Sequence, residues 1–352
     1  MSGSASIEIA GRKIGPGHPV YMVAEMSGNH NQSFEEAVRI VEAAKAAGAD
    51  AVKLQTYTAD TITIASDHPA FKLADDTLWA GKTLHQLYQE AYTPWEWQPR
   101  LKEIANDLGM ALFSSPFDFT AVDFLERMQV PAYKVASFEM SDIPLVEYMA
   151  RTGKPVIMST GMASVEEIQE AVDAARGAGC HELVLLKCTS AYPSPPEEMN
   201  ITAIPFMADR FGTVVGLSDH TLTNDTAVAA VALGARVIEK HFTISRSQPG
   251  PDSAFSVEPH EFRSLVDSVR TVEKAMGRPD FIATRHEAGN RHFRRSLFVT
   301  EDVRAGELLT EKNVRSIRPG IGLPPRHYRE VLGRKAARDI RRGTPLSWDL
   351  VG

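Results

Sequence analysis

The chain has 352 residues, of which 43% are hydrophobic and 24% are charged. A chain of this length and composition buries a full core and exceeds the usual size of one domain, which excludes an intrinsically disordered protein. Its longest apolar runs are far shorter than the roughly 18 to 20 residues of a membrane-spanning helix. The N-terminus lacks the basic and apolar segments of a secretion signal, so we expect a cytoplasmic protein. Cys180 and Cys188 have no metal-binding spacing and are expected to be buried thiols of the core.

The charge of the chain is distributed unevenly. The net charge is −7, but residues 285–352 contain 15 Lys and Arg against 8 Asp and Glu, a balance of +7. Residues 1–284 contain 23 basic against 37 acidic residues, a balance of −14. No basic stripe with interleaved aromatic residues accompanies the positive segment, which argues against nucleic acid as a partner. A small anionic ligand fits this charge better.

A short apolar segment with strand preference repeats eight times, and amphipathic helical patterns lie between the repeats. The predicted strands are residues 21–25, 51–55, 111–115, 132–137, 155–159, 183–187, 214–218 and 237–241. The helical pattern that begins at Phe34 stops at Gly48, and Ser164 begins a capping box. Eight such units predict an α/β fold of the (β/α)8 TIM barrel type, with an open doubly wound sheet as the alternative.

Three further segments surround this repeat. Residues 7–14 alternate around a glycine turn and predict a small hairpin that plugs the barrel from below. Residues 58–92 form a longer insert, which contains Trp79 and is expected to fold over the barrel mouth. Later in the chain the pattern changes to short strands and turns. We therefore predict a catalytic barrel domain with its hairpin over residues 1–284, and a linker with a small second domain over residues 285–352. That second domain has about 60 residues, near the lower limit for independent stability, and is expected to dock on another surface.

Polar side chains gather where the predicted strands end. In a barrel of this type the active site lies at the carboxyl ends of the strands. Those ends supply Glu25, Asn29, His30, Lys53, Gln55, Ser114, Ser115, Lys134, Ser137, Glu139, Ser159, Thr160, Lys187, Thr189, Ser190, Tyr192, Ser218, Asp219, His220, Glu239, Lys240, His241 and Thr243. Ammonium and hydroxyl groups bind phosphates and carboxylates, so the pattern predicts an anion site. The alternatives are a lysine that forms a Schiff base with a carbonyl substrate, and side chains that only pack.

Two histidines end neighbouring predicted strands. His220 and His241 can therefore meet one divalent transition-metal ion, whose remaining positions water or a substrate oxygen would fill. The alternative is a pair of hydrogen-bonded core histidines. His30 can face the same site, and a turn after the last strand can direct Asp252 into the mouth or use it only as a cap. No glycine-rich nucleotide motif follows any predicted strand.

These residues belong to a series of ordered motifs. The motifs are Glu25–His30, Val52–Thr56, Phe113–Phe117, Pro131–Lys134, Ser159–Met162, Gly216–Thr221, Glu239–Phe242 and Gly250–Asp252. With them the chain resembles the sialic acid synthase family, which condenses phosphoenolpyruvate with an N-acetylated amino sugar. The likeness covers residues 7–351. It implies a TIM barrel followed by a C-terminal antifreeze-like (SAF, β-clip) domain over about residues 291–351.

Within the family, the segments Leu54–Ala59, Pro94–Trp97 and Lys187–Ser190 resemble the pseudaminic acid branch. N-acetylneuraminate synthases commonly have Asn at the place of Ser190. The resemblance implies that phosphoenolpyruvate, 2,4-diacetamido-2,4,6-trideoxy-L-altrose and water give pseudaminic acid and phosphate. An N-acetylneuraminate or legionaminate synthase is the alternative, with the same mechanism on N-acetylmannosamine or a diacetamido mannose analogue. Two other classes of protein stay open: a Schiff-base aldolase and a non-enzymatic ice-binding or glycan-binding protein.

The resemblance implies a metal-assisted transferase reaction. His220 and His241 would hold Mn²⁺ or Mg²⁺, which polarises the aldehyde of the open-chain sugar for attack by C3 of phosphoenolpyruvate. Water then captures C2, and phosphate leaves with cleavage of the carbon–oxygen bond. The implied catalytic residues are Glu25, Lys53, Lys134, His220 and His241. The implied substrate contacts are Gln55, Ser115, Ser137, Ser159, Ser190, Tyr192, Ser218, Asp252 and Arg318.

The implied contacts divide between the two substrates. Lys53 would bind the carboxylate of phosphoenolpyruvate, and Lys134 with the serines would bind its phosphate. Gln55, Tyr192 and Asp252 would face the sugar. The family also implies a domain-swapped homodimer, in which the SAF domain covers the barrel mouth of the partner and Arg318 reaches its sugar. The opposite charges of the two predicted domains agree with such docking.

Overall fold

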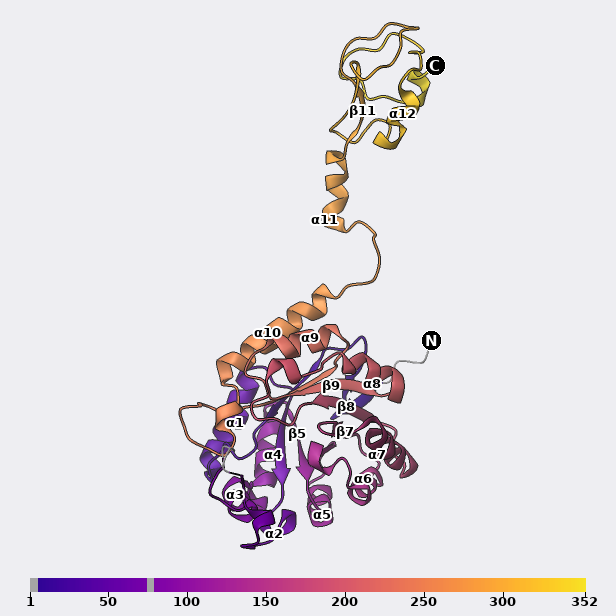
Figure 1. Cartoon of the computed structure of the whole chain (residues 1–352). Coiled ribbons are helices and arrows are strands. Elements are labelled where there is room, and N and C mark those ends of the chain that lie inside the picture. The colour runs from indigo at the N-terminus through magenta and orange to yellow at the C-terminus, as the bar shows by residue number, and fades with distance from the viewer. Residues whose placement is uncertain (1–5, 75–78) are drawn as a thin grey trace. The chain divides into compact units, whose positions relative to one another are not determined.

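The computed structural model describes residues 6–74 and 79–352. The chain divides into two compact units, Met1–Gly277 and Arg278–Gly352 (Figure 1). The sequence pattern places this division a little later, after residue 284. Each unit has its own core and is described by itself.

The first unit is a closed parallel barrel of eight strands, counted over residues 6–74 and 79–277. The strands are β3 (Tyr21–Glu25), β4 (Ala51–Thr56), β5 (Ala111–Pro116), β6 (Tyr133–Val135), β7 (Val156–Ser159), β8 (Leu183–Cys188), β9 (Val214–Asp219) and β10 (Val237–His241). Strand β10 pairs in parallel with β3, which closes the ring. The predicted TIM barrel is therefore confirmed, and the open sheet is wrong.

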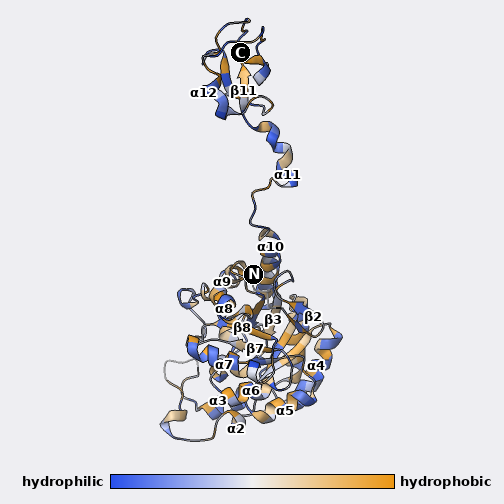
Figure 2. Cartoon of the chain, turned by 90° about the vertical axis from the view of Figure 1, so that its right-hand side faces the viewer, coloured by the Kyte–Doolittle hydropathy of each residue, from blue (hydrophilic) through white to orange (hydrophobic). Residues whose placement is uncertain are grey.

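Amphipathic helices surround the barrel (Figures 1 and 2). They are α1 (Phe34–Ala46), α4 (Gln98–Asp107), α5 (Phe119–Arg127), α6 (Ile143–Ala150), α7 (Val165–Gly177), α8 (Ala203–Phe211), α9 (Asp225–Ala232) and α10 (Pro259–Ala275). The predicted capping box of α7 is present, because the Ser164 side chain accepts from the Glu167 N–H and the Glu167 side chain accepts from the Ser164 N–H. Helix α1 ends just before Gly48, whose φ of 94° is the left-handed conformation that glycine adopts easily.

Strand alternation gives the barrel two apolar layers. Outward residues of the strands pack against the helices, while inward residues such as Val23 and Phe113 form a separate inner cluster. The predicted hairpin, β1 (Ile7–Ile9) paired with β2 (Arg12–Ile14), places its isoleucines in this inner cluster. The amino-terminal half of the barrel is thus filled with apolar side chains. The carboxyl ends of the strands are left for polar ones.

The insert after β4 lies over the barrel mouth, as its sequence predicts. It contains α2 (Ala59–Ile62) and α3 (Leu84–Ala91). The indole N–H of Trp79 donates to the Pro251 carbonyl over 2.9 Å, and its ring centroid lies 6.5 Å from that of Tyr192. Residues 75–78 of this predicted segment lie outside the described residues.

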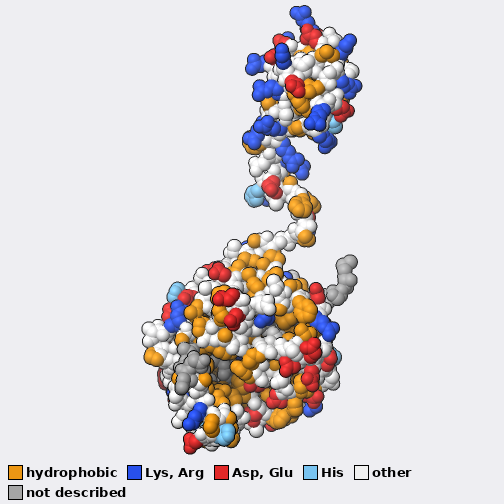
Figure 3. Space-filling model, in the orientation of Figure 1, with side chains coloured by type: hydrophobic (Ala, Val, Ile, Leu, Met, Phe, Trp, Pro, Cys, Tyr) orange, Lys and Arg blue, Asp and Glu red, His pale blue; other side chains and the backbone are white. Residues whose placement is uncertain are grey.

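The second unit has a small core of its own. It contains α11 (Arg285–Ala288), the antiparallel pair β11 (Ser296–Val299) and β12 (Val314–Ile317), and α12 (Tyr328–Val331). Leu297, Val314 and Leu346 are among its fully buried side chains. Many Lys and Arg side chains lie on the face of this unit that Figure 3 shows. Among the helices of both units that are described, none is long and apolar enough to cross a membrane.

Gly216 provides a test of the inner packing of the barrel. A Cβ on Gly216 would lie 2.3 Å from the Val237 carbonyl oxygen and 2.6 Å from Cδ2 of Leu186. We predict that Gly216→Ala lowers the free energy of unfolding by about 1–3 kcal/mol, because paired strands cannot move apart to admit the methyl group. Urea denaturation measures this change.

Gly177→Ala is the matched control for this prediction. Gly177 ends α7, and no atom lies within 4 Å of the place that an added methyl group would take. The control is expected to be neutral or to stabilise by up to about 1 kcal/mol, since alanine favours the helix. Equal urea midpoints for the two variants would contradict the packing prediction.

Candidate active site

The polar site lies at the carboxyl ends of the barrel strands. Every second residue of a strand faces inward, and the inward residues change from apolar to polar toward that end. The inward polar residues are Glu25, Lys53, Gln55, Ser115, Lys134, Ser159, Ser218, Glu239 and His241. All of them except Gln55 are buried. The register of neighbouring strands aligns Glu25 with both Lys53 and His241.

Buried lysines and glutamates form a charged cluster in this site. The Lys53 ammonium lies 3.2 Å from Oε2 of Glu25 and 3.1 Å from Oε1 of Glu239. The Lys134 ammonium lies 3.8 Å from the same Glu239 oxygen. The Gln55 amide donates to the other Glu25 oxygen over 2.9 Å. These contacts let ionised groups stay in a nearly dry site.

The environment gives the two lysines different pKa values. Burial alone would lower the pKa of Lys53, but the carboxylates of Glu239 and Glu25 hold it above its ordinary value. Burial dominates at Lys134 and lowers its pKa to about 8, although Glu239 partly offsets the effect. Lys53 is therefore a permanent cation. Lys134 loses its charge in mildly alkaline solution.

The two glutamates are also distinguished by their surroundings. Burial raises the pKa of Glu25 above its ordinary value, and the nearby Lys53 offsets this only in part. Burial acts in the same direction on Glu239, but the Lys134 and Lys53 ammonium groups hold its pKa below the ordinary value. Glu239 is therefore suited to remain ionised. Its raised pKa makes Glu25 the better proton acceptor of the two.

Hydroxyl groups gather beside Lys134. Its ammonium donates to the Ser159 hydroxyl over 2.7 Å. A Cβ on Gly161 would lie 2.3 Å from the Ser190 hydroxyl and 2.7 Å from that of Ser137, so segments after β6, β7 and β8 converge there. The buried Ser115 hydroxyl has no hydrogen-bond partner among the described residues. Such convergent donors around an ammonium fit a phosphate group.

The two histidines lie side by side in the mouth. Their ring centroids are 5.3 Å apart, and the Tyr192 ring lies 4.5 Å from that of His220. Nδ1 of His220 lies 2.9 Å from the Thr189 carbonyl, so in the neutral imidazole Nδ1 carries the proton and Nε2 has the free lone pair. Nδ1 of His241 is buried and has no partner in the described part of the chain.

This arrangement fits a divalent cation. Burial, with His220 next in importance, holds the pKa of His241 well below its ordinary value, which keeps the imidazole in its neutral, ligating form. Over residues 6–74 and 79–352, no group of three or more His, Cys, Asp and Glu side chains is arranged to hold a metal. A cation held by His220 and His241 would therefore take its other ligands from water or a substrate.

A loop after β10 completes the wall of the site. The Gly28 N–H donates to the Asp252 carboxylate over 3.2 Å, which joins this loop to the one after β3. Burial raises the pKa of Asp252 above its ordinary value. The Phe255 ring packs 5.0 Å from Tyr192 and 4.9 Å from His241. Asp252 and Tyr192 thus lie beside the histidines, and Gln55 lies beside Glu25, which is aligned with His241.

The structure brings together most of the residues predicted for the site. At the mouth lie Glu25, Lys53, Gln55, Ser115, Lys134, Ser137, Ser159, Ser190, Tyr192, Ser218, His220, His241 and Asp252. Arg318 lies in the other unit, directly after β12. Glu239 is missing from the implied catalytic and substrate contacts, although its position two residues before His241 on one strand face indicates it.

Several strand-end residues lie elsewhere. His30 does not face the mouth: its Nε2 lies 3.0 Å from the Thr93 hydroxyl and its Nδ1 accepts from the Gln32 N–H, so both ring nitrogens are used. Lys187 and Lys240 have the outward register of their strands. Cys180 is a core thiol as predicted. Cys188 is buried too, but its sulfur lies 3.9 Å from Nδ1 of His220, in the mouth rather than the core.

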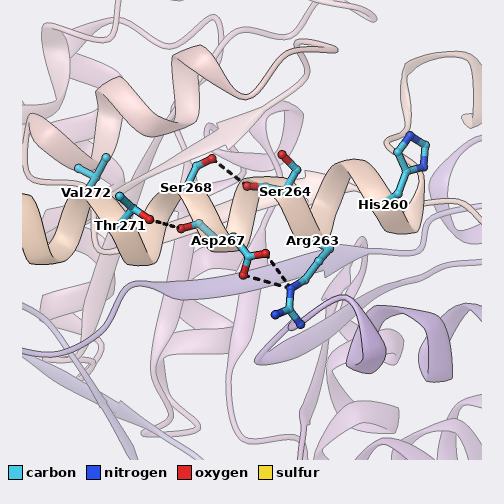
Figure 4. Close-up of a pocket in the computed structure, with 7 residues that line it drawn as sticks. All are labelled: His260, Arg263, Ser264, Asp267, Ser268, Thr271 and Val272. Atoms are coloured by element: carbon cyan, nitrogen blue, oxygen red, sulfur yellow. Dashed lines mark hydrogen bonds and ion pairs between the residues drawn. The ribbon is translucent and has the colours of Figure 1, made fainter.

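A separate surface cavity lies on the outer face of α10. It has a volume of about 570 Å³ and is lined by residues of this helix (Figure 4). Arg263 pairs with Asp267 over 3.0 Å, and the Ser268 hydroxyl donates to the Ser264 carbonyl. These interactions run along one helix, as does the bond that the Thr271 hydroxyl donates to the Asp267 carbonyl. We therefore assign the chemistry to the barrel mouth.

Known proteins resemble the chain over most of its length. A pseudaminic acid synthase from Helicobacter pylori is 43% identical over 94% of this chain and 97% of its own length. One from Campylobacter jejuni is 44% identical over 93% and 95%. The crystal structure of the spore coat polysaccharide biosynthesis protein SpsE from Bacillus subtilis has a TM-score of 0.68 and 32% identity, and the match covers 99% of both chains.

Family comparisons agree with the two units. Residues 294–352 match the SAF domain. Residues 40–280 match the NeuB family, which covers most of the barrel. The chain therefore belongs to the NeuB family, with a SAF domain at its C-terminus.

Proposed function

We propose that the chain is a phosphoenolpyruvate-dependent pseudaminic acid synthase, a cytoplasmic transferase. It joins phosphoenolpyruvate to 2,4-diacetamido-2,4,6-trideoxy-L-altrose and releases phosphate. The observation that supports this most is the buried cluster of Lys53, Lys134, Glu25 and Glu239 beside the histidine pair. The names of the two relatives above support the choice of sugar.

Phosphoenolpyruvate would occupy the cationic side of the mouth. Its carboxylate would pair with Lys53, which stays charged. Its phosphate would pair with Lys134 and accept from the hydroxyls of Ser137, Ser159 and Ser190. Ser115 and Ser218 would complete this pocket, because the Ser115 hydroxyl has no partner in the described residues and the Ser218 hydroxyl donates to Glu239 over a long 3.3 Å.

His220 and His241 would hold Mn²⁺ or Mg²⁺ at the other side of the mouth. When bound, such a cation polarises the aldehyde oxygen of the open-chain sugar. The Thr189 carbonyl fixes the tautomer of His220, and the neighbouring residues Gln55, Tyr192 and Asp252 would orient the sugar. C3 of phosphoenolpyruvate then attacks the aldehyde carbon.

Glu25 would accept the proton of the water that adds to C2 in the next step. Water attacks C2 and loses one proton to the Glu25 carboxylate, which returns it to the alkoxide formed from the aldehyde. The C2–oxygen bond to phosphate then breaks, and the departing phosphate takes the second proton of the added water as the C2 carbonyl forms. The raised pKa of Glu25 suits a group that gains and returns a proton, and the Gln55 amide orients its carboxylate. Glu239 would keep the two lysines in place.

We propose further that the SAF unit covers the mouth of a partner subunit in a swapped homodimer. Large apolar side chains are exposed on the mouth loops after β6, β7 and β9, with Phe138 61%, Met162 65% and Leu222 44% exposed. Exposed apolar side chains of this size are typical of an interaction surface. The basic surface of the SAF unit complements the acidic barrel, and Arg318 would reach the sugar of the partner.

Phosphate release tests the reaction directly. The enzyme receives phosphoenolpyruvate and Mn²⁺ with either the trideoxy sugar or N-acetylmannosamine, with and without EDTA. We predict release with the trideoxy sugar alone, and its loss when EDTA removes the cation.

Each contrary result has its own meaning. Release with N-acetylmannosamine would contradict the proposed sugar but not the chemistry. Phosphate release that persists in EDTA would contradict the proposed need for a divalent cation. Borohydride trapping with pyruvate would indicate a Schiff-base aldolase instead.

The lowered pKa of Lys134 predicts a pH dependence. Its ammonium is present below a pKa of about 8 and is lost above it, so kcat/KM for phosphoenolpyruvate should fall about tenfold per pH unit in the alkaline range. Lys134→Arg keeps a cation at every pH used and should lack this limb, with a lower overall rate. The measurement is the pH profile of phosphate release with Mg²⁺. The same limb in both proteins would exclude Lys134 as its source.

Arg318 tests the contribution of the SAF unit. We predict that Arg318→Ala raises KM for the sugar about tenfold, because a charge-assisted hydrogen bond is lost, and leaves KM for phosphoenolpyruvate within twofold. Arg315→Ala on the adjoining strand is the control and should change neither value. An equal loss for both substrates would contradict this role.

A further inference from the structure

A buried ion pair lies on the outer side of the barrel, behind the histidines. Lys240 stands between Glu239 and His241 in β10, but its side chain points away from the mouth, toward the helices. It meets Asp219, the last residue of β9. The side chains of Lys240 and Asp219 are 1% and 0% exposed.

The Lys240 ammonium organises the loop between β9 and α9. It donates to Asp219 Oδ2 over 2.7 Å, to the Thr221 carbonyl, and to the Thr223 carbonyl over 3.2 Å. These acceptors use all three of its N–H groups. The other Asp219 oxygen accepts from the Thr221 N–H over 2.9 Å, and the Thr226 hydroxyl lies 3.3 Å from Oδ2. The first residues of this loop thus surround the Lys240 ammonium group.

His220 lies inside this arrangement. Its neighbours on either side, Asp219 and Thr221, both bind Lys240, whereas its own ring has the Thr189 carbonyl as partner of Nδ1. His241 directly follows Lys240 in the chain. One side chain therefore ties the backbone of the first histidine to the strand that bears the second. The ring centroids of these two histidines are 5.3 Å apart.

Stability alone does not explain such a pair well. A buried ion pair contributes little net stability compared with apolar residues of the same size, because both charges lose their hydration. The Lys240 pair differs from an isolated one because two of its acceptors are backbone carbonyls of the loop that bears His220. It restrains a loop rather than only filling space.

We propose that Lys240 is a positioning residue that sets the separation of His220 and His241, and through it the affinity of the site for a divalent cation. This inference rests on the proposed cation site. It assigns a role to a residue that touches neither substrate nor cation.

The test is cation binding by the full chain without substrates. Lys240→Met removes the ammonium and keeps the length of the side chain. We expect the dissociation constant for Mn²⁺, measured by isothermal titration calorimetry, to rise about 10- to 100-fold, as for other residues that orient metal ligands. At saturating Mn²⁺, KM for phosphoenolpyruvate should stay within twofold of the parent value.

Two controls separate positioning from stability. Lys240→Met leaves the Asp219 charge unpaired, so Lys240→Met combined with Asp219→Asn should regain thermal stability while Mn²⁺ binding stays weak. Lys154 lies just before β7, at the opposite end of the barrel, and Lys154→Met removes its ion pair with Glu126. It should leave Mn²⁺ affinity within twofold of the parent.

The outcomes are distinct. Parent-like Mn²⁺ affinity in the double variant, or an equal loss in Lys154→Met, overturns the positioning role. If Lys240→Met does not fold, the double variant decides. His220→Ala is measured alongside, and if it binds Mn²⁺ as tightly as the parent, or if the parent binds none, the proposed cation site fails and the role of Lys240 fails with it. If only the role of Lys240 is wrong, the Lys240 variants bind Mn²⁺ like the parent, whereas His220→Ala still binds it more weakly.

Discussion

The mutual compensation of buried charges at the barrel mouth is the interaction on which the rest of the site depends. Lys53 has only 5% of its side chain exposed, and Glu25 none. An ionised group in such surroundings is costly unless a partner and hydrogen bonds replace its hydration. Glu25, Lys53, Glu239 and Lys134 supply one another with those partners. A ligand that brings negative charge therefore enters a site whose cations are already held in place.

The same compensation gives side chains of one chemical type different pKa values. Glu239 faces two ammonium groups and remains ionised, whereas Glu25 has a raised pKa despite its contact with Lys53. Lys53 stays charged between two carboxylates, while Lys134 has a pKa of about 8. The site therefore combines, in one small volume, a permanent positive charge that can bind an anion, a carboxylate that can accept a proton, and a histidine pair that can hold a metal cation. The proposed synthase chemistry uses all three.

The support for the site extends through the barrel wall. Inward residues hold the charges and the histidines, and the outward Lys240 restrains the loop that bears His220. The apolar hairpin fills the opposite end, so the polar groups are confined to the mouth. The insert closes over the mouth through Trp79, which donates to the Pro251 carbonyl. The strand residues, Lys240, the hairpin and the insert therefore confine the same small set of mouth side chains from different sides.

Local pattern in the sequence was sufficient for the strands, the hairpin, the capping box at Ser164 and the family, because alternation and capping depend on residues close together in the chain. It also placed Lys53, Lys134 and the histidine pair at strand ends. It could not determine the partners of the remaining polar residues. Glu239 joins the site, whereas His30 is held by Thr93 and Gln32, and Lys240 turns to Asp219. Tertiary structure alone decided these partners, because strand register and loop closure bring together side chains that are far apart in the sequence.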